Sequence, residues 1–546
     1  MKLTQTSIKS LAIAAFVGLV VMIPLSCSKN FLNQTDTSKI GEESLFHTPQ
    51  DGISLVNAIY DVLQHDNQNY VLKSLFYNAN FLAQDFFNWG ADISYNNYQF
   101  TPTFGAIATF WEDSYQGIAR ANSAFPIIAK MRTDGVLTDS LANRLTGEAY
   151  FLRGLFYYYL AVTFGGVPLE LKTVTDNGLH PRSTQDSVFM TVISDMTTAA
   201  GLLPWAQDLA ASDLGRATKG AALGYLGSAQ MWLKKYSDAV ATYKQLDGRY
   251  TLMPNYLDIH EYNHQNNQES LFEIQFNNPP GGKEDWNGGN EVTWMSSFGM
   301  PEEISTFGYD YANPALYNSF EAGDTRKLAT VIGPGDVHPS PAIQIKNYSK
   351  VIAGFAAGDP RYIGTDGKII NTCGTVAKPW LGAELPLRSG YYGTKFWRDP
   401  NVTGATASTD PNDAVQHIFG DQNVILLRYA EVLLSLADAQ LNSGDQAGAL
   451  LTLQKVRDRA WGKLTNPAVV VPASPFGPDV QNIIINEYRH ELGDEMSLWY
   501  DLRRTGKHLD YIKNTFGISI PQGHDLLPIP AQEIASNPTL KQNPGY

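Results

Sequence analysis

His260, Glu261 and His264 form an H-E-x-x-H pattern, the arrangement that binds zinc in metallopeptidases. On an α-helix, two histidines four residues apart lie on one face and can coordinate Zn²⁺ together. The glutamate between them then polarises a metal-bound water for attack on a substrate. A zinc metallohydrolase is therefore one hypothesis that this sequence raises.

The residues around this motif do not favour the helix that zinc chemistry needs. The segment 255–270, NYLDIHEYNHQNNQES, has weak helical periodicity, follows Pro254 and runs into several Asn and Gln residues. It also lacks the apolar residues that would pack such a helix into a core. We therefore interpret the match as accidental and expect His260 and His264 to be solvated loop side chains.

A second chemistry is indicated by aromatic residues interleaved with amides, outside the predicted helices. Aromatic rings bind the C–H faces of sugars, while asparagine side chains hydrogen-bond the hydroxyl groups. Each ring could instead be a half-buried packing residue. The candidate ligand-binding residues are Asn88, Trp89, Tyr95 and Tyr98 in the stretch 84–100, and Trp286, Asn290 and Trp294 in the stretch 283–300.

The composition is that of a globular protein that does not bind nucleic acid. The 546 residues are 43% hydrophobic and 17% charged, which suffices for a large core. A net charge of −14 would repel a phosphate backbone, so we expect no nucleic acid among the partners. A polar, uncharged ligand such as a sugar is compatible with this charge.

Residues 1–26 have the pattern of a lipoprotein signal peptide. Lys2 and Lys9 precede the apolar run 11–24, and Cys27 stands where the signal ends. We expect the Cys27 thiol to carry a lipid that anchors the mature chain to a membrane. The alternative is an ordinary cleaved signal with an incidental cysteine. Once Cys27 is lipidated, Cys373 has no disulfide partner.

A repeated offset predicts paired antiparallel helices. Leu226-Gly227 is followed twelve residues later by Ala239, and Leu436-Ala437 is followed twelve residues later by Ala449. Small residues at these positions let two helices approach closely across a short turn, which is the spacing of a tetratricopeptide hairpin. A further helix over 145–164 is apolar around a wide arc, so we expect it to be largely buried.

These patterns divide the chain into regions of different character. We expect an N-terminal helical region over 27–250, a loop-rich insert with a few short strands over 251–420, and a C-terminal helical region over 421–546. The insert is rich in Gly, Pro and Asn, and its clearest strand is SLFEIQF at 270–276. The predicted fold is mainly α, with tetratricopeptide-like hairpins supporting long irregular loops, where binding sites tend to occur.

Nine blocks in order along the chain resemble the SusD/RagB family of outer-membrane nutrient-binding lipoproteins of Bacteroidota. They begin at Cys27 and end with LLPIPAQEIASNPTLKQNPGY at 526–546. The blocks between them include FWEDSYQGIARAN (110–122), EAYFLRGLFYYYLAVTFGGVPL (148–169), ILLRYAEVLLSLADA (425–439) and INEYRHELGDEMSLWYDLRRTG (485–506). The order of the blocks makes coincidence an unsatisfactory explanation.

The resemblance implies a mainly α, SusD-like fold and a function without catalysis or a cofactor. It implies capture of nutrient glycans by a lipid-anchored protein of the outer membrane that faces the cell exterior. It also implies a partner, a SusC-like TonB-dependent barrel over which the lipoprotein sits as a hinged lid. In this family the ligand-binding aromatics come from loops near the two stretches named above.

A dense run of charges near the C-terminus has two interpretations. Paired carboxylates could act as general acid and base in a glycosidase. We instead interpret the run as helical, with ion pairs that clamp the C-terminal tail. The rival functions for the whole chain are a zinc metallohydrolase and a tetratricopeptide-type scaffold that binds another polypeptide. The charged residues of the run are Glu487, Arg489, Glu491, Glu495, Asp501, Arg503 and Arg504.

Overall fold

The computed structural model describes residues 46–64, 70–88, 91–276, 299, 310–333, 336, 338–340, 391–397 and 422–546. The chain divides into two units, residues 1–51 and residues 52–546. In the first unit, the Asp51 carboxylate accepts a hydrogen bond from the backbone N–H of Thr48 at 2.7 Å.

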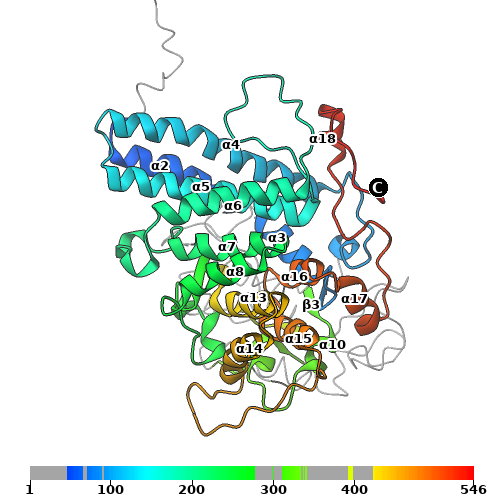
Figure 1. The fold of residues 1–546 in the computed structure, drawn as a ribbon. Helices are drawn as coiled ribbons and strands as arrows, with labels where there is room; N and C mark the ends of the chain where they lie inside the picture. The colour runs from blue at the N-terminus through cyan, green and yellow to red at the C-terminus, as the bar shows by residue number, and fades with distance from the viewer. Residues whose placement is uncertain are drawn as a thin grey trace, which may run out of the picture. The chain divides into compact units, whose positions relative to one another are not determined.

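Helices arranged in successive rows form the scaffold of the second unit (Figure 1). Each helix packs against the next, α4 on α5, α5 on α6, α6 on α7 and α7 on α8, and α8 then packs on α13. Threonines at positions 138, 184 and 218 cap α5, α6 and α7 by accepting a backbone N–H. The scaffold helices are α4 Gly105–Thr133, α5 Asp139–Phe164, α6 Gln185–Leu202, α7 Lys219–Trp232, α8 Tyr236–Tyr243, α13 Tyr429–Asn442, α14 Gln446–Ala460 and α15 Val480–Leu492. Helix α2, Pro49–Tyr60, includes the boundary between the two units.

The two predicted hairpins are present as α7–α8 and α13–α14. A Cβ atom at Gly227 would lie 2.3 Å from the Tyr243 ring, so the first hairpin closes only because this position has no side chain. Ala437, Ala239 and Ala449 are fully buried. The prediction of a mainly α fold with tetratricopeptide-like hairpins is confirmed.

The helix predicted over 145–164 is confirmed in α5, which ends at Gly165 with a positive φ of 76°. Its residues from Ala149 to Phe164 are buried on nearly every side. The Phe151 ring packs on Phe272 with centroids 4.8 Å apart, and Tyr158 packs on Tyr225 at 5.3 Å. The core of the scaffold is therefore aromatic and lies around α5.

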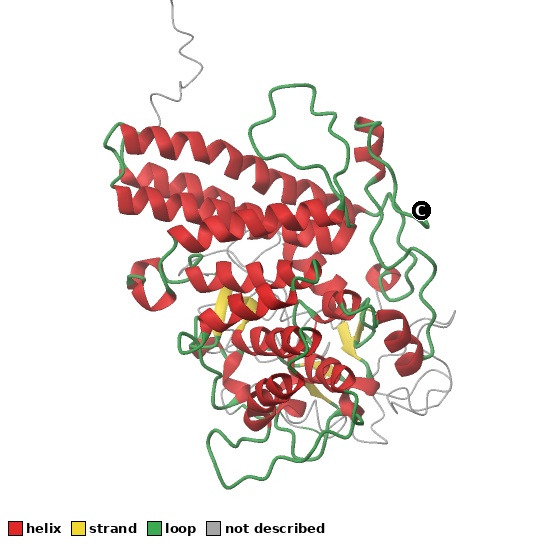
Figure 2. Cartoon of the chain, in the orientation of Figure 1, coloured by secondary structure: helices red, strands yellow, loops and turns green. Residues whose placement is uncertain are grey.

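Short elements connect and flank the scaffold (Figure 2). In the described ranges the strands form antiparallel pairs, β1 with β3, β2 with β6 and β4 with β5. The strands are β1 Phe86–Asn88, β2 Ser270–Ile274, β3 Asp310–Ala312, β4 Val331–Ile332, β5 Tyr392–Gly393 and β6 Val424–Arg428. The short helices are α3 Tyr70–Asn80, α10 Pro314–Ser319, α11 Arg326–Thr330, α16 Leu498–Arg504, α17 His508–Phe516 and α18 Ala531–Ser536.

Strand β2 confirms the strand predicted at 270–276, with a difference in burial. Leu271, Phe272, Glu273 and Ile274 are all buried, so the strand does not show the half-buried alternation that its sequence indicates. The two register shifts in its pairing with β6 disturb the alternation of the side chains. Within the described segments, no helix has the length and apolar content that crossing a membrane requires.

Candidate functional site

The H-E-x-x-H motif does not lie on an α-helix. It begins at His260, directly after the short 3-10 helix Tyr256–Ile259, and includes the whole of another, Tyr262–His264. The His260 side chain is only 10% exposed and its Nε2 lies 3.4 Å from Glu495 Oε1, whereas His264 remains 41% exposed. The expectation of a solvated loop side chain is therefore wrong for His260, because this ring belongs to the interior.

The motif is thus divided between two environments. Burial lowers the pKa of His260, and this ring faces Glu495. His264 instead lies with Glu261 and Asp258, whose donor atoms are all within 4.8 Å of one another. A zincin needs both histidines of the pattern on one metal, and here they have different neighbours. The geometry therefore gives no support to a zinc peptidase mechanism.

The charge run near the C-terminus lies on α15, on α16 and in the turn between them, and Glu487, Glu491 and Glu495 of the run belong to a buried ion cluster. Arg428 donates to Glu269 at 2.8 Å, to Glu491 and to Glu495. Arg459 donates to two of these three carboxylates, Glu269 and Glu491. The ion cluster consists of Glu269, Asp324, Arg326, Lys395, Arg428, Arg457, Arg459, Glu487, Glu491 and Glu495.

Each carboxylate in this cluster is matched by a cation. Burial alone would raise the pKa of Glu491, but Arg459, Arg428 and Arg326 bring it down to about 2. A general acid must hold a proton near neutral pH, and a fully buried, permanently ionised carboxylate cannot reach a substrate. Among the described residues, Glu487, Glu491 and Glu495 of the run therefore form internal ion pairs rather than a glycosidase pair. Burial raises the pKa of Asp501 to about 6, and this carboxylate accepts a hydrogen bond from Arg504 at 3.0 Å.

Three of the predicted ligand-binding residues are structural anchors. Asn88, Tyr95 and Tyr98 are at most 2% exposed. Asn88 Nδ2 donates to Asp310 Oδ1 at 2.7 Å, and the Tyr98 hydroxyl donates to the Leu82 carbonyl at 2.6 Å. The packing alternative therefore describes Tyr95 and Tyr98, and neither ring is open to a ligand.

These anchors fix the backbone on both sides of Trp89. The Asn96 side chain donates to the carbonyls of Phe81 and Phe86, at 3.0 and 2.8 Å. Just before β1, Asp85 accepts from both Arg489 Nε at 3.0 Å and Arg489 Nη2 at 2.6 Å. Trp89, Trp286, Asn290 and Trp294 lie outside the described residues, as does Cys27, so their roles stay predictions.

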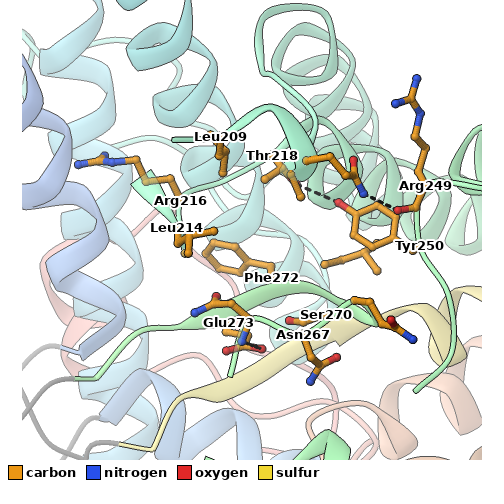
Figure 3. A pocket seen from close by; sticks show the side chains of 16 residues that line it. Leu209, Leu214, Arg216, Thr218, Arg249, Tyr250, Asn267, Ser270, Phe272 and Glu273 are labelled. Atoms are coloured by element: carbon orange, nitrogen blue, oxygen red, sulfur yellow. Dashed lines mark hydrogen bonds between the residues drawn. The ribbon is translucent and has the colours of Figure 1, made fainter. Parts of the chain in front are cut away.

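A cavity of ≈ 260 Å³ lies beside β2 and is shown in Figure 3. The Phe272 and Tyr250 rings and Leu209 border it, whereas the guanidinium groups of Arg216 and Arg249 point away from its centre. A neighbouring cavity of ≈ 210 Å³ shares Phe272. Both are smaller than the roughly 300–1,000 Å³ of typical small-molecule pockets. Neither of these two cavities can enclose an oligosaccharide.

Two family models match the chain. One, described as "Starch-binding associating with outer membrane", matches residues 30–230. The other, described as "SusD family", matches residues 260–546, which is more than half of the chain. The chain belongs to the SusD family.

Relatives in sequence and structure agree with this membership. "SusD-like protein P38" of Formosa agariphila is 26% identical, and the match covers 97% of this chain and 98% of the relative. A solved "Laminarin binding SusD-like protein" has a TM-score of 0.69 at 24% identity, covering 92% of this chain and all of that one. A SusD homologue from Bacteroides thetaiotaomicron has a TM-score of 0.71 at 20% identity, covering 94% and 99%. At these identities the structural matches show the shared fold.

Sequence reasoning missed several residues that position the site of this SusD family chain. Asp85 and Asp310 hold β1 in place, and their partners Arg489 and Asn88 lie 404 and 222 residues away along the chain. No local pattern connects residues so distant. Of the Asp85–Arg489 pair, only Arg489 belongs to a recognisable sequence pattern, the charge run near the C-terminus.

Proposed function

We propose that this chain is a non-catalytic outer-membrane lipoprotein that binds nutrient glycans and delivers them to a SusC-like TonB-dependent transporter. Family membership supports this proposal, and so does the laminarin-binding relative with the same fold. Lipidation of Cys27 would tether the chain, and docking over the barrel would bring the captured glycan to the transporter.

The observation that carries the proposal is the anchoring of the segment 85–98. Asp85, Asn88, Asn96 and Tyr98 are all buried, and each is bonded to a distant or neighbouring backbone or side chain. Trp89 follows Asn88 of β1 in the sequence, and Asn96 and Tyr98, which the scaffold also holds, come a few residues later. An aromatic residue on a short link between fixed anchors suits a stacking role, because little conformational entropy is lost on binding.

In this proposal the ligand lies across rings rather than inside a cavity. Trp89, Trp286 and Trp294 would stack on sugar faces, and Asn290 would bind hydroxyl groups. The small size of the cavities near β2 agrees with such an open platform. Binding of this kind needs neither a metal nor an acid–base pair.

The test uses the mature chain without its lipid, residues 28–546, and a panel of neutral polysaccharides that includes laminarin. We expect Trp89→Ala to weaken the binding of the preferred glycan at least ten-fold, which is about 1.4 kcal/mol, as measured by isothermal titration calorimetry. Trp205→Ala is the matched control, because Trp205 is a half-buried surface ring stacked by Arg249 at 4.7 Å.

Two results would contradict the proposal. Undiminished binding by Trp89→Ala, Trp286→Ala and Trp294→Ala would exclude the platform. Cleavage of the bound glycan by the purified chain would exclude the non-catalytic function. An equal loss in the Trp205→Ala control would show that the effect is not specific to the platform.

A further inference from the structure

The proposed function does not use a third cavity, which is larger than the two beside β2. It is an open groove of ≈ 540 Å³ between the first turns of α4, the loop 165–184 and helix α18. Figure 1 shows this loop rising beside α18. We call it the α4–α18 groove; its walls include Trp111, Tyr115, Val174, Leu179, Glu533 and Leu540.

Side chains from α4 and α5 hold one end of the loop. The Asn122 amide donates to the Glu170 carbonyl at 2.8 Å, and Arg153 Nη1 donates to the Leu171 carbonyl at 3.0 Å. Arg153 is itself fixed by an ion pair with Asp195 at 2.7 Å. The Tyr157 hydroxyl accepts from the Glu170 N–H at 2.6 Å.

The C-terminal tail holds the other end of the loop. Arg182 donates to the Lys541 carbonyl and to Asn543 Oδ1, both at 2.7 Å. The Asn537 amide donates to the His180 carbonyl, also at 2.7 Å. The loop is therefore tied down at both ends, and its exposed side chains are presented on a constrained backbone.

Three apolar side chains on this loop face solvent. Leu171, Val174 and Leu179 are 46%, 43% and 39% exposed, and the last two line the groove. Single exposed aliphatic residues are ordinary, but three within nine residues beside an open groove form a patch. Covering such side chains is favourable by about 25 cal/mol per Å² of apolar surface removed from water.

The groove is also acidic. The side chains of Glu112, Glu170 and Glu533 line it, and none of the described residues lining it is Lys or Arg. Glu170 is paired with His180, whose pKa it raises, so Glu112 and Glu533 are the carboxylates available to a ligand. Burial, together with the negative charge of Glu112, raises the pKa of Glu533. A cation placed in the groove would relieve this repulsion, since opposite charges within a few ångströms favour the ionised form of a carboxyl group.

We propose that the α4–α18 groove docks an extended segment of a partner protein in which Lys or Arg side chains alternate with apolar ones. The apolar side chains would cover Val174 and Leu179, and the cations would pair with Glu112 and Glu533. An anionic membrane or a second copy of this face would bring like charges together. A neutral glycan would leave the carboxylates without a cation.

The probe is a fluorescein-labelled ten-residue peptide of alternating Lys and Leu, with a Glu and Leu peptide of equal length as its counterpart. Fluorescence anisotropy with residues 28–546 should show binding of the first peptide only. Glu112→Gln with Glu533→Gln should weaken that binding at least ten-fold. The control pair Asp134→Asn with Asp139→Asn removes the same charge from exposed positions near the α4–α5 turn and should leave binding unchanged.

A second set of variants, at apolar positions, distinguishes docking in the groove from general attraction of a basic peptide to an acidic protein. Val174→Ser with Leu179→Ser should also weaken binding, whereas Leu450→Ser with Leu451→Ser, on exposed positions of α14, should not. Carbodiimide cross-linking should join a peptide lysine to Glu112 or Glu533, as read by mass spectrometry. Unchanged unfolding midpoints would show that all variants fold.

Three outcomes would overturn the proposal. Equal losses in the control pairs would mean non-specific electrostatic attraction. Displacement of the peptide by a neutral saccharide would assign the groove to a glycan, and concentration-dependent dimerisation lost in Val174→Ser with Leu179→Ser would assign it to a second copy. None of these results bears on Trp89, so failure here remains distinct from failure of the glycan-binding proposal.

Discussion

The core of the helical scaffold and the ion cluster are both buried, yet opposite chemistry holds them together. Around α5 and the α7–α8 hairpin, contacts are largely apolar and aromatic, as between Gly227 and Tyr243. In the ion cluster, Arg428 and Arg459 bond the carboxylates of Glu269, just before β2, and of Glu491 on α15, far away along the chain. Apolar packing tolerates small shifts, whereas buried ion pairs accept few geometries.

The scaffold and the ion cluster therefore have different roles in the fold. The scaffold provides most of the buried apolar surface, which is the main favourable term in folding. The ion cluster fixes how α15 meets β2, β6 and α11, and the neighbouring Arg489 fixes Asp85 before β1. The segment that carries the proposed ligand platform is therefore positioned by directional polar contacts on an apolar support.

The largest expected effect comes from leaving the cations of the cluster without their shared partner. Glu491 pairs with Arg326, Arg428 and Arg459, all fully buried. Because Gln keeps the shape and removes the charge, Glu491→Gln should lower the free energy of unfolding by about 3–5 kcal/mol. Urea denaturation would measure this loss. Asp139→Asn, which breaks an exposed pair with Arg132, should cost no more than about 1 kcal/mol; equal losses would remove the distinction between the regions.

Asp310 is a buried carboxylate bonded by an amide instead of a cation, and its contribution to stability should depend on pH in the opposite sense to that of Glu491. Burial raises the pKa of Asp310 to about 7, despite its bond from Asn88. The unfolded chain releases this proton near pH 4 and the folded chain only near 7, so stability falls as pH rises through this window. The loss is up to about 4 kcal/mol by linkage. Glu491, with its pKa lowered to about 2, instead loses stabilisation as pH falls from about 4.5.

Asp310→Asn tests this contrast, because the amide cannot ionise. Urea denaturation from pH 4 to 7 should show wild type losing stability relative to the variant as the pH rises. If stability changed with pH in parallel for the two proteins, Asp310 would be ionised in the folded chain. The distinction between buried carboxylates with and without a cationic partner would then disappear.

The sequence predicted the scaffold well and the site only in part, for a physical reason. Helical periodicity and the Gly227 offset are local, so α5 and both hairpins could be found without the structure. The burial of His260 depends on Glu495, and that of Asn88 on Asp310, partners more than two hundred residues away. Tyr95 and Tyr98 have the composition of a sugar platform, yet tertiary contacts place them in the core.

The smallest of these effects should appear in the scaffold. Gly227→Ala puts a Cβ 2.3 Å from the Tyr243 ring, which must move within a packed hairpin, at a cost of about 1–3 kcal/mol. The better helix propensity of alanine offsets up to about 1 kcal/mol of this. Gly201→Ala in α6 is the matched control, since a Cβ there meets nothing within 4 Å and should be neutral or stabilising. Denaturation of both variants isolates the contact with Tyr243, because helix propensity contributes alike to each.

A stable Gly227→Ala protein would mean that the hairpin shifts to accept the methyl group, so that the scaffold deforms more readily than its close contacts indicate. The region that holds the platform would then owe its geometry to the ion cluster alone.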